Sequence, residues 1–243
     1  MAHIHGRRDV QRRRVLLPTW LLKTATAVTG LAMAAFVLIH MLGNLKVFLD
    51  PPGVDLYAAW LREVGAPALP HGFVLWVFRI VMGMCLIIHL LSVLILWQRS
   101  ASTRTRGARH MGWRGYGAKA MMPTGLIMLL FITAHILDLT AGVLIAPESF
   151  QHPTPSPDGG SVFYAVANLS ASLARPIAAV GYGIALIALG IHLAHGIGLA
   201  WQDLGGVRER GRSIARLVGY ALALLIVVGN GAVVAAAWMG AFQ

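Results

Sequence analysis

Five histidines stand inside long apolar stretches of the sequence: His40, His89, His135, His192 and His195. An imidazole in the hydrocarbon of a membrane costs free energy unless it is ligated or hydrogen-bonded, so each is a candidate functional residue. Neutral imidazole is also a common metal ligand. The chemistry that these residues suggest is therefore ligation of a metal centre, or hydrogen bonding between helices.

The composition predicts the environment of these histidines. Of 243 residues, 57% are hydrophobic and 12% are charged, against about 25% charged residues in soluble domains. Apolar stretches of about 20 residues each predict an all-α membrane protein, a bundle of five transmembrane helices. We expect a basic segment, 1–19, and one transmembrane domain, 20–240, with spans near 20–47, 72–97, 121–145, 173–201 and 217–238.

The net charge of +11 comes largely from basic residues that lie between the spans. They predict topology in the lipid bilayer, and no nucleic-acid binding. The N-terminus and the loops after the second and fourth spans are basic, which predicts a cytoplasmic N-terminus, an outside C-terminus and a multi-pass protein of the cell (inner) membrane. Arg12-Arg13-Arg14 loosely resembles a twin-arginine signal, but the long span that follows favours a retained first helix.

The first and third spans share a repeat. Between residues 29–42 and 124–137, seven of 14 positions are identical, including a Thr-Gly pair and the histidine ten residues after the glycine. At a rise of ~1.5 Å per residue, His40 and His135 lie about 15 Å beyond their glycines. The two histidines are therefore expected at a similar depth, in the outer half of the membrane.

The second and fourth spans run in the opposite direction and place a second pair of histidines. His89 and His192 each lie in an Ile-His-Leu sequence, eight and nine residues before a Trp-Gln pair. Both are expected in the inner half, at matching depths. Two imidazoles at equal depth on facing helices are what a bis-histidine haem needs. The alternative is that each histidine hydrogen-bonds a neighbouring helix.

These residues resemble the cytochrome b558 family, the single-chain, five-helix membrane anchors of succinate:quinone oxidoreductase, which is respiratory complex II of the tricarboxylic acid cycle. The resemblance covers most of residues 20–240. It rests on four motifs in order: Thr29-Gly30…Phe36…His40…Gly43-Asn44, Arg79…His89, Thr124-Gly125…Phe131…His135…Asp138, and His192-x-x-His195-Gly196…Gln202-x-Leu204-Gly205.

The resemblance implies two b haems, each held by two histidines. His40 and His135 would hold the distal haem, and His89 and His192 the proximal one. In the family the last ligand precedes a glycine by four residues, as His192 precedes Gly196.

Three further residues are candidates for binding these cofactors or the quinone. Asp138 follows His135 by three residues on the same side of its helix, where it could orient that imidazole or relay protons. Arg79 lies two to three turns outward of His89 and could neutralise a haem propionate or extend to the interface. His195 could bind a propionate or quinone, or simply pack one turn away.

Cys85 is the single cysteine, so the chain has no internal disulfide. It shares a helix face with His89, four residues on. It is either a small buried apolar residue or a ligand of an iron–sulfur cluster that replaces the proximal haem. A Rieske-type centre needs two cysteines and two histidines, so Asp138 or another residue would have to complete the set.

The resemblance also implies partners and an activity. A flavoprotein subunit and an iron–sulfur subunit would dock on the cytoplasmic face, and electrons would pass through this chain to menaquinone or ubiquinone. The chain has no flavin or nucleotide motif, so it is not expected to oxidise succinate alone. The alternatives are a cytochrome b anchor of another quinone-linked dehydrogenase, and a transporter whose histidines relay protons.

Overall fold

The computed structural model describes residues 17–103, 113–157 and 160–242. The arginines of the N-terminus, together with Arg104, Arg106 and Arg109, lie outside the described residues. The helices are α1 (Thr19–Leu45), α2 (Pro51–Glu63), α3 (Phe73–Thr103), α4 (Trp113–His135), α5 (Ala165–Leu173), α6 (Pro176–Asp203) and α7 (Glu209–Trp238). A short 3₁₀ helix, η1 (Lys46–Phe48), follows α1, a π-helical segment, η2 (Ile136–Ala141), follows α4, and β1 (Thr154–Pro155) pairs antiparallel with β2 (Ser161–Val162).

Among the described residues, five helices are long and apolar enough to cross a membrane: α1, α3, α4 with η2, α6 and α7. In lipid the backbone must satisfy its own hydrogen bonds, so long apolar runs become helices. Proline sits in the first turn of α6, where its missing N–H is harmless. The helix ends beside Gly205, whose φ of +93° suits glycine. The predicted fold class is confirmed, and the protein is a multi-pass membrane protein.

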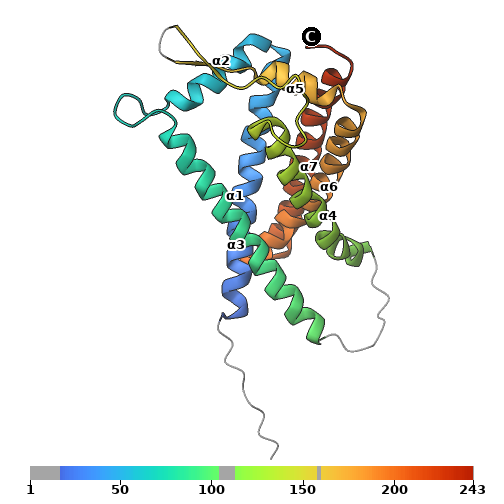
Figure 1. Cartoon of the computed structure of the whole chain (residues 1–243). Helices are drawn as coiled ribbons and strands as arrows, with labels where there is room; N and C mark the ends of the chain where they lie inside the picture. The colour runs from blue at the N-terminus through green and yellow to red at the C-terminus, as the bar shows by residue number, and fades with distance from the viewer. Residues whose placement is uncertain (1–16, 104–112, 158–159, 243) are drawn as a thin grey trace, which may run out of the picture.

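The bundle is built around α1 and α6, which pack against each other and against α7 (Figure 1). Met41 of α1, Leu193 of α6 and Ile226 of α7 form the centre of this contact. The other two spans lie on the flanks, because α3 packs chiefly on α1 and α4 on α6. Among the described residues, neither α1 with α4 nor α3 with α6 is an extensively packed pair.

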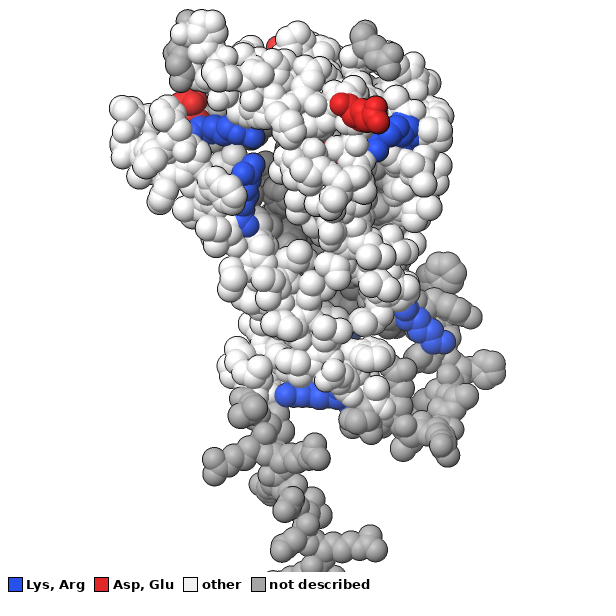
Figure 2. Space-filling view, viewed as in Figure 1, with Lys and Arg blue, Asp and Glu red and all other residues white. Residues whose placement is uncertain are grey.

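The two ends of the bundle differ. One end, here called the basic end, holds the start of α1, the end of α3, the start of α4 and the loop from α6 to α7 (Figure 1). The opposite end carries α2, the β1–β2 hairpin and α5. On the face drawn in Figure 2, a broad uncharged belt separates charged side chains near the two ends. Such a belt is what the hydrocarbon of a bilayer requires.

Candidate functional site

His89 of α3 is held against α1 by its Nδ1 atom. This nitrogen lies 3.2 Å from Oγ1 of Thr29 and 3.1 Å from the carbonyl oxygen of Thr26. The Thr29 hydroxyl donates its own hydrogen to the carbonyl of Ala25, at 2.6 Å. Both neighbours of the imidazole therefore act as acceptors, so Nδ1 of His89 is the donor. The Nε2 atom keeps its lone pair, which is the form that ligates a metal.

His192 of α6 is held against α4 in the same manner. Its Nδ1 atom lies 3.1 Å from Oγ1 of Thr124 and also bonds to the backbone of Met121. The Thr124 hydroxyl donates to the carbonyl of Ala120 at 2.6 Å, so it too accepts from the imidazole. His89 and His192 are close enough to interact electrostatically. The two histidines predicted as the inner pair thus have equivalent supports.

The glycine of each Thr-Gly pair faces one of these rings, and at Gly30 the missing side chain makes room for it. A Cβ atom on Gly30 would lie 3.1 Å from Cε1 of His89, which is closer than side chains normally approach. A Cβ atom on Gly125 would lie 3.6 Å from Cε1 of His192, an ordinary contact. From the spacing alone, the Thr-Gly pairs only set the depth of the outer histidines. In the fold they support the inner histidines of two other helices.

The outer pair, His40 of α1 and His135 of α4, comes together with ring centroids 6.0 Å apart and planes at 81°. Phe36 stacks on His40 at 5.5 Å, and Phe131 lies 5.6 Å from His135. These contacts follow from the four-residue spacing of each Phe and His, which places both rings on one helix face.

A hydrogen-bonded network connects His135 with the opposite end of the bundle. Nδ1 of His135 lies 3.1 Å from the hydroxyl of Tyr182 on α6, and Tyr182 is hydrogen-bonded to Asp138. Asp138, 3% exposed, also accepts from the Ser172 hydroxyl and from Nη2 of Arg175, at 2.6 Å. Asp138 therefore acts on His135 directly through its charge and also through Tyr182.

Sequence reasoning missed three members of this network: Tyr182, Ser172 and Arg175. A signal existed for Arg175, because it is the only arginine or lysine in the span predicted for 173–201, which follows a loop without Lys or Arg. Tyr182 gave a weaker one, as a hydroxyl inside an apolar span. Ser172 gave none, since serine is common in that loop.

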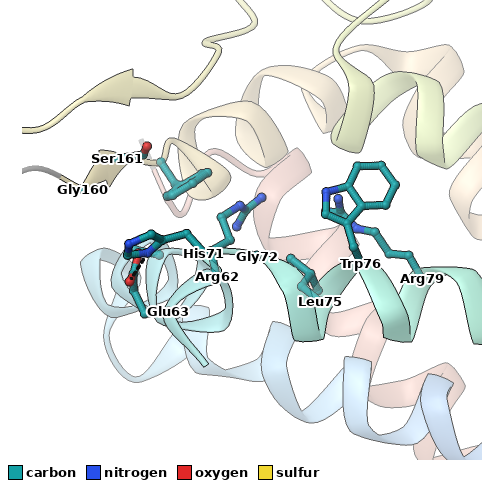
Figure 3. A pocket seen from close by; sticks show the side chains of 11 residues that line it. Arg62, Glu63, His71, Gly72, Leu75, Trp76, Arg79, Gly160 and Ser161 are labelled. Carbon is teal, nitrogen blue, oxygen red and sulfur yellow. Dashed lines mark ion pairs between the residues drawn. The ribbon is translucent and has the colours of Figure 1, made fainter. Parts of the chain in front are cut away.

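The remaining predicted residues have no recorded contact with the imidazoles of the histidine pairs among the described residues. The hydrogen bond of His195 runs from Nδ1 to the carbonyl of Ile191 in its own helix, at 3.3 Å. Arg79 lines a pocket at the opposite end of the bundle (Figure 3). Cys85 is a half-buried free thiol. In the part of the chain that the structure describes, no three His, Cys, Asp or Glu side chains group as a metal site.

The fold defines a class, a membrane protein with five helices long and apolar enough to span the bilayer, and it brings four of the predicted histidines together as two pairs. Residues 119–228 match the family described as succinate dehydrogenase/fumarate reductase transmembrane subunit. The matched segment includes Thr124, His135, Asp138 and His192. Over this segment the chain is similar to the membrane subunits of that enzyme complex. No curated protein and no solved structure matches the chain.

Proposed function

We propose that this chain is the membrane anchor and electron-transfer subunit of a succinate:quinone oxidoreductase. The observation that carries the proposal is the equivalent support of His89 and His192, each with Nδ1 bonded to a repeated threonine and Nε2 left as a ligand atom. Metal-ligating histidines characteristically donate their second nitrogen in this manner. The family match over residues 119–228 supports the same reading.

The residues fit haem b better than an iron–sulfur cluster. His40 and His135, whose ring centroids lie 6.0 Å apart on two different helices, would supply two imidazoles to one haem, which is the ligand set of a b-type centre. A cluster needs four ligands, and within the described residues Cys85 lacks the grouped partners for it. Haem, when bound, supplies a one-electron centre within the membrane.

The chain's own residues then have distinct tasks. His40 with His135, and His89 with His192, hold the two centres at different depths. Thr29 and Thr124 orient the inner imidazoles.

Quinone reduction also consumes protons, and we infer that polar groups near the helix ends bind the quinone. Tyr182, Asp138 and Arg175 form a hydrogen-bonded connection from the outer pair toward the opposite end. A flavoprotein subunit and an iron–sulfur subunit would dock at the basic end, which we assign to the cytoplasm because of its arginines.

The test is a redox difference spectrum of the purified complex and of four single variants, His40→Ala, His135→Ala, His89→Ala and His192→Ala. We expect a b-type α-band in the parent protein and loss of one centre in each variant. His195→Ala is the matched control, since it removes a histidine from the same helix as His192 without touching a pair. A parent spectrum without a b-type band would refute the haem assignment.

Co-purification separates the proposal from its nearest rival. Succinate-reducible centres and two co-purifying subunits, one with flavin and one with iron–sulfur clusters, are expected for complex II. A cytochrome b of another quinone-linked dehydrogenase would bring different partners and would not respond to succinate.

A further inference from the structure

A pocket of about 440 Å³ opens at the opposite end of the bundle, between α2, the start of α3 and β2. Two arginines from different helices line it, Arg62 of α2 and Arg79 of α3. Figure 3 shows their side chains pointing toward one another. Two neighbouring cations repel each other, so this arrangement is stabilised when an anion lies between them.

Both guanidinium groups rest on aromatic rings. Cζ of Arg62 lies 3.8 Å from the ring centroid of Phe163, and Cζ of Arg79 lies 5.1 Å from that of Trp76. Stacking covers a guanidinium face and leaves the N–H edges available for hydrogen bonds. One N–H of Arg62 donates to the carbonyl of Ala58, at 2.5 Å. Burial, and then the charge of Arg79, lower the pKa of Arg62 from its ordinary value.

The acidic side chain that lines the pocket is already engaged. Glu63 pairs with Nδ1 of His71 at 2.6 Å. Among the described residues, no ion pair includes Arg62 or Arg79. The positive charge of the pocket is therefore available to an anion from outside the chain.

An apolar track leads away from the same pocket along α3. It begins at Trp76, which lines the pocket and is 61% exposed. Its members recur at intervals of three or four residues and so share one helix face: Trp76, Ile80, Met84, Ile87 and Leu91, all exposed. A tryptophan at the junction of charge and apolar surface is typical of the membrane interface.

We propose that the pocket of Arg62 and Arg79 binds the phosphate of an anionic phospholipid, whose acyl chains lie along the exposed face of α3. Guanidinium forks suit phosphate oxygens, which accept two parallel hydrogen bonds from one arginine. A free phosphate would use the arginines alone, whereas a lipid also uses the apolar track. No residue of either histidine pair lines the pocket, and the proposal does not depend on the function proposed above.

The test is native mass spectrometry of the purified, delipidated complex, titrated with phosphatidylglycerol or phosphatidylcholine that carry the same acyl chains. We expect tighter binding of phosphatidylglycerol. Arg62→Gln and Arg79→Gln should each weaken it about fivefold, since one basic residue near a membrane surface contributes about 1 kcal/mol. Arg79→Lys keeps the positive charge but not the paired N–H donors of the guanidinium group, so it should weaken phosphatidylglycerol binding less than Arg79→Gln does. Lys46→Gln, a cation removed at the same end but outside the pocket, is the matched control.

Three results would overturn the proposal. One is equal binding of the two lipids by the parent protein, a comparison that does not depend on any variant folding. Another is undiminished phosphatidylglycerol binding by both glutamine variants. The third comes from a parallel titration with inorganic phosphate. If phosphate alone binds the parent complex as tightly as the lipid does, the pocket is a site for a free anion.

Discussion

The hydroxyl group of Thr124 donates its hydrogen to the carbonyl of Ala120, so its oxygen accepts a hydrogen bond from His192. Thr124→Val keeps the shape of the side chain and removes this acceptor. Loss of such an outer partner typically costs tenfold or more in metal affinity, so we expect about tenfold weaker haem retention and an altered reduction potential at the inner centre. Spectroelectrochemical titration of the purified complex measures both.

Thr133→Val is the control for that substitution. Thr133 lies on the same helix and donates to the carbonyl of Leu129 at 3.0 Å, but it is exposed. Its replacement should leave both centres unchanged. Equal effects of the two substitutions would show that the helix, and not the bond to His192, is responsible.

Gly30 and Gly83 give a second matched pair. A Cβ at Gly30 meets Cε1 of His89 at 3.1 Å, whereas a Cβ at Gly83 meets nothing within 4 Å. Both changes to alanine raise helix propensity by a similar amount. We therefore expect Gly30→Ala to shift the potential of the inner centre and Gly83→Ala to leave it alone. A shift of the same size in both variants would contradict the contact.

At the scale of elements, the segment η2 directs the side chain of Asp138 into the protein. There Asp138 connects the end of α4 with Ser172 of α5 and with Arg175, which directly precedes α6. A π-helical turn inserted after an α-helix changes the direction of the side chains that follow, and such turns are frequent at functional sites. Here it follows His135 directly. The i, i+3 spacing of an α-helix therefore does not predict the relative directions of the His135 and Asp138 side chains.

Removing the charge of Asp138, which is buried and pairs with the half-buried Arg175, should destabilise the packing of these elements. Breaking a fully buried ion pair costs about 3 kcal/mol and an exposed one contributes about 0–1 kcal/mol, so this half-buried pair should lie between the two. Asp138→Asn should therefore lower the midpoint temperature of unfolding clearly more than Asp203→Asn, which breaks the exposed pair with Lys23. Thermal unfolding of both variants in the same detergent measures this, and a reversed order would contradict it.

At the scale of the whole molecule, the predicted orientation in the membrane can be tested with single cysteines. With Cys85 replaced by serine, Gln151→Cys marks the opposite end and Val207→Cys marks the basic end. Both positions are exposed. Because basic loops stay in the cytoplasm, an impermeant maleimide should label the first in intact cells and the second only in inverted membranes. The reverse pattern would invert the topology and the docking side of the partner subunits.

The sequence alone determined the class of fold and predicted which histidines lie at a common height. Long apolar runs must become helices in lipid, because every backbone N–H and C=O needs an internal partner there. The constant rise per residue then converts the spacing of His40 and His135 from their glycines into a common depth. The sequence predicted the ends of the helices less well. The helix α7 begins at Glu209, before the apolar span expected from 217, because a helix can continue beyond the membrane into water.

Only the tertiary structure decided what surrounds each histidine. Residue spacing gives the height of a side chain along its helix, but it does not say which neighbouring helix that side chain contacts. The support of His89 by Thr29, and of His192 by Thr124, joins residues 60 and 68 positions apart. The link from His135 to Tyr182 spans 47 positions. These contacts depend on how the helices are placed and rotated around α1 and α6, which is settled by packing of side chains from all of them at once.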